Sequence, residues 1–302
     1  MDKLQCMQIF IKVVEQGGFS PAAIRLGLSR GTVSKAIAHL EAQLGVRLLH
    51  RTTRQVSLTE AGQIYYRNVR AILENIEASE AEITGFARRP YGHVRITAPL
   101  SLGERDLSEI LAAFCRDNPE ISLELQLTDR FVALVEEGVD LAVRIGLLED
   151  SSLIAKKITE TALGLYCSPE FLRRRGRLYT PEDLKPEDCL RYQNRNSGRY
   201  WTLTHPDGRE HKVQVHGRVS SNNGEVLATM AACGLGVVML PKFIAKDYMA
   251  SGKLVEVLRP WSPGNVGVWA VYPTRQHVPL AVRHLIDYIA VHLPERLPEE
   301  DS

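Results

Sequence analysis

The sequence is short of the features that mark membrane, secreted and metal-binding proteins. Its first residues include Asp2 and Lys3 and form no uninterrupted apolar stretch, and no apolar run further on is long enough to cross a bilayer. The five cysteines are odd in number, widely scattered and never arranged as Cys-x-x-Cys. We therefore expect a cytoplasmic protein with reduced thiols, no cofactor and no membrane partner. A redox role for one thiol stays open.

Signatures of catalysis are also missing. The chain has no nucleophile elbow, phosphate loop, zinc pair or Ser/His/Asp grouping that spacing can place. Gly234-Leu235-Gly236 follows a helical pattern and precedes a strand, which is the reverse of a dinucleotide-binding loop. His205, His211 and His216 flank a turn, and their parity does not put all three on one face of a strand. These patterns predict that the protein is not an enzyme and holds no metal.

The charge distribution is more informative than the total charge. The 302 residues carry a net charge of only +1, and the charged and hydrophobic fractions of 24% and 44% are those of an ordinary globular protein. Residues 1–56, however, contain eight basic and three acidic residues, a net charge of +5, which leaves −4 on the remainder. A basic end on an acidic body favours binding of nucleic-acid phosphates by the N-terminal part.

A helix-turn-helix pattern occupies residues 19–38. An apolar stripe at helical spacing predicts a preceding helix over residues 4–16. Ser20-Pro21 has the form of a cap followed by the first position of a short helix, which Gly27 would end. Ser29 is expected to cap the next helix, whose apolar stripe packs inward and leaves polar residues on the other faces. Two short helices joined by a glycine-containing turn form a helix-turn-helix.

A wing and a long helix are predicted next. Residues 46–58 place apolar and β-branched residues around a basic tip, which is typical of a two-stranded wing and completes a DNA-binding domain over residues 1–59. Thr59 is expected to cap a linker helix over residues 60–89. Its apolar residues follow a heptad seam that normally requires a partner helix, so we predict a dimer; packing on its own C-terminal domain is the alternative. The seam residues are Tyr65, Val69, Ile72, Ile76 and Ile83.

From His93 onward, short apolar strands alternate with helical patterns. Such alternation predicts an α/β domain over residues 93–302 with a largely parallel sheet. We divide it into subdomain I, residues 93–161 and 267–293, and subdomain II, residues 162–266. The predicted strands are 94–98, 121–127, 141–145, 163–167, 236–240 and 266–272, with helices after Ser101, around 131–137, after Ser168 and over 280–292.

Many spaced positions together resemble the signature of the LysR-type transcriptional regulators. The N-terminal match runs through Phe10, Val13, Gly18-Phe19-Ser20, Ala22-Ala23, Leu26, Ser29, Val33-Ser34, Ile37, Leu40-Glu41, Leu44-Gly45, Leu48, Arg51-Thr52-Thr53-Arg54, Leu58-Thr59 and Ala61-Gly62. A looser likeness continues through Phe114, Pro119, Gly138 to Gly146, Ser168 to Leu172, Gly234-Leu235-Gly236, Leu240-Pro241 and Gly252-Lys253-Leu254. The resemblance implies a bacterial-type regulator with a winged helix-turn-helix, a linker helix and a two-subdomain α/β effector-binding domain similar to periplasmic binding proteins. Arg30-Gly31 departs from the family pattern, so base preference does not transfer.

The second helix of a helix-turn-helix enters the major groove with its N-terminus first. We predict that Arg30 contacts bases or backbone, and that Ser34 and Lys35 contact backbone and nearby bases. Arg51 and Arg54 in the wing are expected at phosphates or in the minor groove. The predicted DNA-binding set is completed by Ser20 and Thr32.

The ends of strands in two linked α/β units predict the place of a small-molecule effector. Ser101 is expected at a helix N-terminus, where its hydroxyl and the backbone N–H groups of Leu102 and Gly103 suit a small anion; simple helix capping is the alternative. By resemblance, the predicted site also includes Pro99, Leu100, Ile145, Gly146 and Asn222.

The predicted partners are double-stranded promoter or operator DNA, a small and anionic effector, and further copies of the chain in a homodimer or homotetramer. RNA polymerase is a further candidate. Two alternatives stay open: a regulator that needs no effector, and a cytoplasmic binding protein or enzyme built on the α/β domain.

Overall fold

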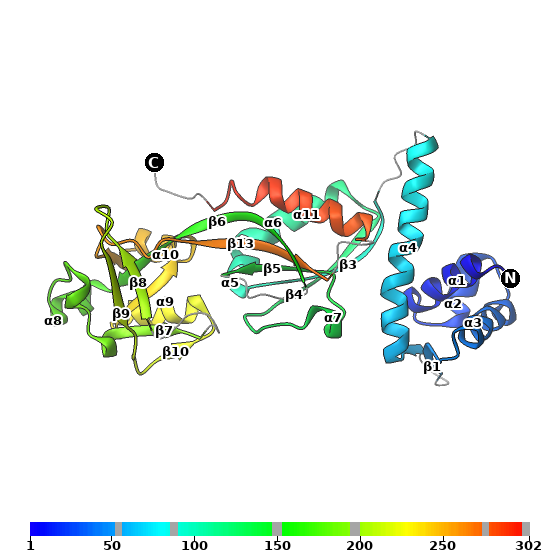
Figure 1. Ribbon diagram of the computed structural model, residues 1–302, viewed down its shortest axis with the longest axis horizontal. Coiled ribbons are helices and arrows are strands. Elements are labelled where there is room, and N and C mark those ends of the chain that lie inside the picture. The colour runs from blue at the N-terminus through cyan, green and yellow to red at the C-terminus, as the bar shows by residue number, and fades with distance from the viewer. Residues whose placement is uncertain (52–55, 85–89, 147–152, 194–199, 274–277, 298–302) are drawn as a thin grey trace. The chain divides into compact units, whose positions relative to one another are not determined.

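The computed structural model describes residues 1–51, 56–84, 90–146, 153–193, 200–273 and 278–297 (Figure 1). The chain forms two compact units. The first consists mainly of residues 1–92, and the second mainly of residues 93–273 and 285–302.

The first unit is a winged helix-turn-helix followed by a long helix, as predicted. Its elements are α1 (Lys3–Glu15), α2 (Phe19–Leu26), α3 (Arg30–Leu44), β1 (Leu49–Arg51), β2 (Val56–Leu58) and α4 (Glu60–Thr84). The two wing strands pair antiparallel, with Leu49 opposite Leu58. Arg54 and the other residues of the wing tip lie outside the described residues.

Local signals set the helix boundaries of this unit. The Oγ atom of Ser29 accepts the N–H of Thr32 at 3.0 Å, which confirms the predicted cap of α3. Gly27 adopts a left-handed φ of 64° and ends α2, a conformation that costs glycine little. Thr59 accepts the N–H of Gly62 through its hydroxyl at 2.9 Å and begins α4, again as predicted.

The predicted cap at Ser20 is wrong. Helix α2 begins at Phe19, because the carbonyl of Gly18 already accepts the N–H of Ala22 at 3.2 Å. Ser20 therefore lies within the first helical turn, where its side chain is exposed.

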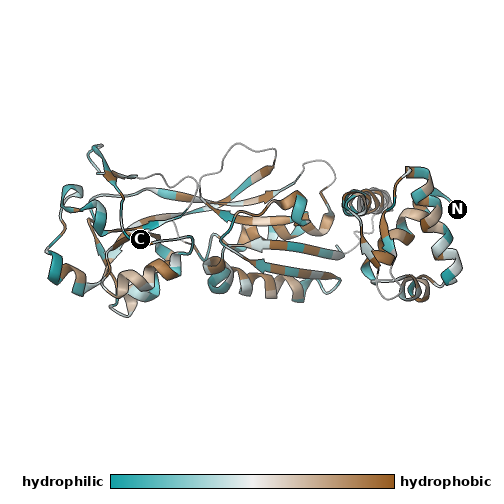
Figure 2. Cartoon of the chain, turned by 90° about the horizontal axis from the view of Figure 1, so that it is seen from below, coloured by the Kyte–Doolittle hydropathy of each residue, from teal (hydrophilic) through white to brown (hydrophobic). Residues whose placement is uncertain are grey.

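The core of the first unit lies between α1, α2, α3, the wing and the start of α4. Along α3, the residues Val33, Ala36, Ile37 and Leu40 are each 0% exposed. This confirms the inward stripe predicted from the spacing. Figure 2 shows the result as brown and teal residues alternating along the helices, as expected where one side of a helix is buried.

A nine-stranded mixed sheet runs through the second unit, in the order β10-β7-β11-β6-β13-β5-β3-β4 with β12 beside β6. The strands are β3 (Gly92–Ala98), β4 (Ile121–Leu127), β5 (Leu141–Ile145), β6 (Ile154–Cys167), β7 (Cys189–Tyr192), β10 (Ser220–Ser221), β11 (Val237–Pro241), β12 (Val255–Val257) and β13 (Asn265–Tyr272). A separate hairpin, which was not predicted, consists of β8 (Tyr200–Thr204) and β9 (Glu210–Gln214).

The helices of the second unit flank this sheet. They are α5 (Leu100–Leu102), the π-helix η1 (Gly103–Leu107), α6 (Ser108–Asp117), α7 (Leu134–Glu137), α8 (Pro169–Arg175), α9 (Gly224–Ala232), α10 (Lys242–Ala250) and α11 (Leu280–His292), with short 3₁₀ turns η2 (Pro181–Asp183) and η3 (Pro186–Asp188). The predicted cap at Ser168 is confirmed, because its Oγ atom accepts the N–H of Phe171 at 3.1 Å.

The prediction of a largely parallel sheet is wrong at its centre. Strand β13 is antiparallel to both β5 and β6. The chain leaves the first half of the unit along β6 and returns along β13, so these two strands must run in opposite directions (Figure 1). β6 pairs with β13 up to Ala162 and with β11 from Leu163 onward. The predicted subdomain boundary at 161/162 stays a prediction.

Candidate functional site

The outward face of α3 carries the residues predicted to contact DNA. Arg30 and Lys35 are exposed, while Ser34 is half-buried. The hydroxyl of Thr32 already takes part in a hydrogen bond, because it lies 2.8 Å from the Ser29 hydroxyl. His39 lies one helical turn after Lys35 and is also exposed, so it belongs to the same surface although sequence reasoning did not select it.

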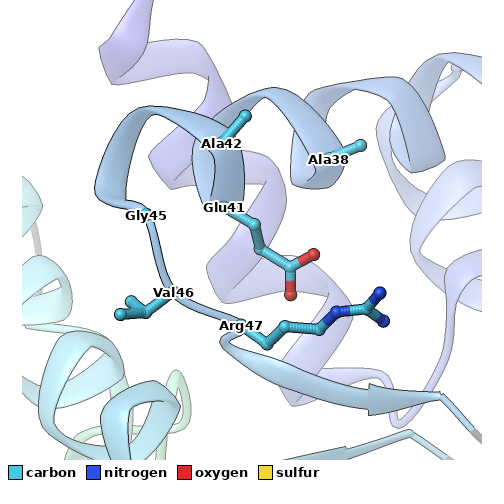
Figure 3. A pocket seen from close by; sticks show the side chains of 6 residues that line it. All are labelled: Ala38, Glu41, Ala42, Gly45, Val46 and Arg47. Atoms are coloured by element: carbon cyan, nitrogen blue, oxygen red, sulfur yellow. The ribbon is translucent and has the colours of Figure 1, made fainter.

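Glu41 joins the C-terminal half of α3 to the wing. One carboxylate oxygen accepts the N–H of Leu48 at 2.9 Å and that of Leu49 at 3.2 Å. Figure 3 shows the side chains of Glu41 and Arg47 beside a shallow pocket at the end of this helix. Since β1 begins at Leu49, these two bonds fix where the wing starts relative to the recognition helix. Arg51 is the last residue of β1, and its side chain is not among those that the structure describes.

Helix α4 starts in close contact with the wing. The hydroxyl of Thr59 donates to the carbonyl of Arg47 at 2.7 Å, and its N–H donates to the carbonyl of Leu48 at 3.0 Å. A Cβ atom at Gly62 would lie 1.9 Å from the carbonyl oxygen of Leu48. The helix therefore approaches the wing so closely that only glycine fits, which explains this residue of the signature.

The predicted seam on α4 divides into two parts. Tyr65 packs against Phe10 with ring centroids 5.6 Å apart, and Val69 is 1% exposed within the same core. Both side chains therefore pack in the core of their own domain, and a part for them in a dimer seam stays a prediction. Further along, Ile72 is 36% exposed and Ile76 is half-buried. The side chain of Ile83 lies outside the described residues.

At the start of the helical segment after β3, the predicted N-terminal position of Ser101 is wrong. The segment begins at Leu100, two residues earlier than expected, and Ser101 is only 6% exposed. The N–H of Gly103 donates to the carbonyl of Pro99 at 2.9 Å and is not free. Leu102 is 0% exposed. Ser101 therefore lies within the helical segment rather than at its N-cap, and its part in anion binding stays a prediction.

A carboxylate of the chain itself lies at this point. Asp129 follows β4, and its Oδ1 atom accepts the N–H of Leu100 at 3.1 Å. Its Oδ2 atom accepts the side-chain amide N–H of Asn223 at 2.6 Å. Asn223 lies in predicted subdomain II, where it also caps α9 by accepting the N–H of Val226 at 2.9 Å. Asp129 therefore links the two halves of the second unit.

Two buried polar atoms on the neighbouring strands β3 and β5 lack hydrogen-bond partners among the described residues. The Nη2 atom of Arg144 and the hydroxyl of Thr97 are both buried and unpaired among the described residues. Thr97 pairs with Ala142 across β3 and β5, and Arg144 is two residues further along β5, so both side chains share one face of the sheet. Burial lowers the pKa of Arg144, and the negative charge of Asp129 opposes this shift. We call Thr97, Asp129, Arg144 and Asn223 the strand-end cluster.

Several other residues predicted for the effector site are next to members of this cluster in the chain. Ile145 pairs with Val268 on β13. Gly146 donates its N–H to Gly267 at 3.0 Å and accepts the indole N–H of Trp269 at 2.9 Å. Leu100 and Asn222 are both exposed, and it is Asn223, the neighbour of Asn222, that bonds to Asp129.

A second link between the halves lies on the π-helix. The guanidinium of Arg105 donates to Glu225 on α9 at 2.7 Å and also bonds to Asp247 on α10. Single turns of π-helix often occur at functional sites, because they shift a side chain out of the regular helical position.

Sequence reasoning missed Asp129, Arg144 and Asn223, although each carried a signal. Asp129 is the first acidic residue after the predicted strand 121–127, and Arg144 is the one charged residue within the apolar strand 141–145. Asn223 stands three residues before Val226, the spacing of a capping residue.

Two family models match the chain. The model described as "Bacterial regulatory helix-turn-helix protein, lysR family" matches residues 4–63, and the "LysR substrate binding domain" matches residues 87–294. An uncharacterized HTH-type transcriptional regulator of Haemophilus influenzae is 35% identical over 282 residues, covering 93% of this chain and 98% of the relative. The regulator CrgA of Neisseria meningitidis serogroup B is 32% identical over 292 residues, covering 96% of this chain and 97% of the relative.

Solved structures agree. The structure of CrgA from Neisseria meningitidis matches with a TM-score of 0.59 at 31% identity, covering 96% of this chain and 98% of that one. The full-length structure of AphB, a virulence activator of Vibrio cholerae, matches with a TM-score of 0.58 at 30% identity, covering 97% and 100%.

A winged helix-turn-helix joined through a long helix to an α/β ligand-binding domain defines a DNA-binding regulator controlled by a small molecule. The chain belongs to the LysR family of transcriptional regulators. Members of this family are not enzymes, which confirms that prediction. Among the described residues, no helix is both long and apolar enough to span a membrane. Nor does any group of three or more His, Cys, Asp or Glu side chains in those ranges form a metal site.

Proposed function

We propose that the outward face of α3 reads the operator and that the wing holds the DNA backbone. The observation that carries this is the complete burial of the stripe Val33–Leu40, which leaves Arg30, Ser34 and Lys35 on the remaining faces. Ser20 on α2 and the wing residues Arg51 and Arg54 are included for phosphate contacts. Thr32 acts by fixing the start of the helix through Ser29.

The test is Lys35→Ala in a gel-shift titration on promoter DNA and on unrelated DNA. We expect weaker binding to both, and a salt slope reduced by about 1, because one phosphate contact no longer releases a counterion. Lys12→Ala is the matched control, since Lys12 forms an ion pair with Glu15 at 2.6 Å on α1. Equal affinity and salt slope for Lys35→Ala and the parent would exclude Lys35 from the interface.

The same proposal includes a homodimer, or a homotetramer built from such dimers, with the dimer formed along the outer part of α4 through Ile72, Ile76 and Ile83. Two reading heads match the two halves of a symmetric operator. It also includes cytoplasmic action at promoters, with RNA polymerase as a further partner. Retention of RNA polymerase by the DNA-bound regulator, but not by the DNA alone, would support that contact.

For the effector, the proposal moves from Ser101 to the strand-end cluster. Arg144 offers a buried and unpaired guanidinium nitrogen, and Thr97 offers an unpaired hydroxyl on the same face. Burying such donors without partners is costly, and a ligand carboxylate would satisfy them. We therefore place a small organic acid at Arg144, beside Pro99, Leu100, Ser101, Leu102, Ile145 and Gly146, with Asn222 at the margin. Arg144→Gln should abolish effector binding without changing ligand-free DNA affinity, as calorimetry and gel shifts would show.

A further inference from the structure

Asp129 is in an unusual position for a site that accepts an anion. Its carboxylate bonds to the backbone of Leu100 at 3.1 Å and to Asn223 at 2.6 Å. Thr128 donates its N–H to the carbonyl of Ala98 at 2.9 Å, so Asp129 lies at the end of β3, next to the strand β5 that carries Arg144. No ion pair joins Asp129 and Arg144 in the described part of the chain. The carboxylate of Asp129 therefore bonds to the other half of the unit through Asn223, while the Nη2 atom of Arg144 stays unpaired among the described residues.

Two carboxylates side by side repel each other. Like charges that lie close together in a partly buried site repel each other more strongly than they do in bulk water. An anion that reaches Arg144 therefore approaches a second negative charge that the chain already holds in place. It can bind well only if Asp129 moves away from it.

We propose that Asp129 is a carboxylate latch: it closes the two halves onto each other through Asn223, and an organic acid bound at Arg144 expels it. This inference rests on the effector site proposed above and adds its regulation. Anion binding and the Asp129–Asn223 bond oppose each other, so each weakens the other by the same factor. The effector then opens the link at the start of α9 rather than closing it.

Asp129→Asn tests the latch because it removes the charge and keeps an oxygen that can accept the N–H of Leu100. Acetate serves as the probe, with acetamide as its uncharged analogue, and binding is followed by melting temperature and by NMR line shifts of labelled acetate. We expect acetate to bind Asp129→Asn roughly tenfold more tightly than the parent, and acetamide to bind both proteins equally. Asp129→Ala, which removes the acceptor as well, should shift acetate affinity in the same direction.

Glu225→Gln is the matched control. It weakens the other link between the halves, the 2.7 Å bond from Arg105, without touching the strand-end cluster. Backbone hydrogen exchange at the start of α9 should rise in both Asp129→Asn and Glu225→Gln. Acetate affinity should rise only in Asp129→Asn. A rise of acetate affinity in both variants would show that loosening alone promotes binding, and would overturn the latch.

Arg144→Gln separates failure of the latch from failure of the effector site. If acetate binds the parent or Asp129→Asn in a way that Arg144→Gln abolishes, the site stands. The latch is then wrong if Asp129→Asn fails to bind acetate more tightly than the parent. If Arg144→Gln binds acetate as the parent and Asp129→Asn do, the effector site itself is wrong, and the latch falls with it.

Discussion

The two units of this regulator differ in how far apart along the chain the residues lie that make their internal contacts. In the DNA-binding unit, Ser29 bonds to Thr32 three residues away, and Glu41 bonds to Leu48 seven residues away. In the effector unit, Asp129 bonds to Asn223 over 94 residues and Arg105 to Glu225 over 120. Short-range contacts form with little loss of chain entropy, whereas long-range contacts depend on the whole fold being in place. The first unit is therefore specified locally and the second globally.

The largest effect is expected in the part of α4 that the first unit does not bury in its own core. Ile72 and Ile76 lie one turn apart on α4 beyond the core of their own domain. Changing both to Lys would bury four charges in a symmetric apolar seam, so the dimer dissociation constant should rise at least about 100-fold. Analytical ultracentrifugation measures this directly.

Ile64→Lys is the control for the seam, since Ile64 is 50% exposed near the start of the same helix. It should leave the assembly unchanged. Sedimentation of the double variant as the parent assembly would show that α4 does not hold the dimer together.

Gly62→Ala tests how local the first unit is. The added methyl group would meet the carbonyl of Leu48 at 1.9 Å, which can be relieved only by shifting the helix or the wing. We expect the DNA-binding unit to lose about 2–3 kcal/mol of unfolding free energy and most of its DNA affinity. Effector-domain melting should stay unchanged, as calorimetry of the full chain would resolve.

Gly31→Ala is its counterpart, because the nearest atom to an added Cβ is the Ser29 oxygen at 3.7 Å. Replacing glycine within a helix should stabilise the unit by about 0.5–1 kcal/mol. If Gly62→Ala is no less stable than Gly31→Ala, the close approach of α4 to the wing is not a constraint.

A smaller effect is expected for the bridge between α3 and the wing. Glu41→Ala would leave two backbone N–H groups without their acceptor and should cost about 1–3 kcal/mol. Glu41→Gln keeps an accepting oxygen and should recover most of this loss. Urea unfolding of both variants gives the difference, and equal stability of the two would assign the effect to the charge of Glu41 instead.

The smallest effect concerns pH and the effector unit. Burial raises the pKa of Asp106 above its usual value of 3.8, against the opposing charges of Arg105, Arg296 and Lys246, with Glu109 adding to the rise. The folded state thus binds this proton more tightly than the unfolded chain does. Ionised Asp106 costs stability at neutral pH, and the cost disappears as the pH falls through the raised pKa and below 3.8.

Asp106→Asn should therefore raise the melting temperature of the effector domain at pH 7, with a gain that shrinks steadily toward pH 4. A difference from the parent that is constant over this range would mean that ionisation of Asp106 is not its cause.

The same contrast explains what could be predicted from sequence. The caps at Ser29 and Thr59, the stop at Gly27 and the buried stripe of α3 are all decided by residues a few positions apart, and spacing shows them. The errors at Ser20 and Ser101 are shifts of two residues each, because the carbonyls of Gly18 and Pro99 already accept the first helical N–H.

The antiparallel arrangement of β6 and β13 and the Asp129–Asn223 bond involve residues about a hundred positions apart. Periodicity carries no information over that distance. Burial of Tyr65 and Val69 was missed for a related reason, because a heptad pattern does not distinguish a partner helix from the helix's own domain.

The position of β13 also governs the order in which the protein is completed during synthesis. The DNA-binding unit, through α4, is finished at Thr84, whereas the strand that fills the gap between β5 and β6 begins only at Asn265. At about 5–20 residues per second, the ribosome needs roughly 6–25 s to pass from β5 to its partner strand. During that interval the edges of β5 and β6 are open to pairing with other chains. The DNA-binding unit of a nascent regulator can thus be complete while the sheet of its effector unit still lacks β13.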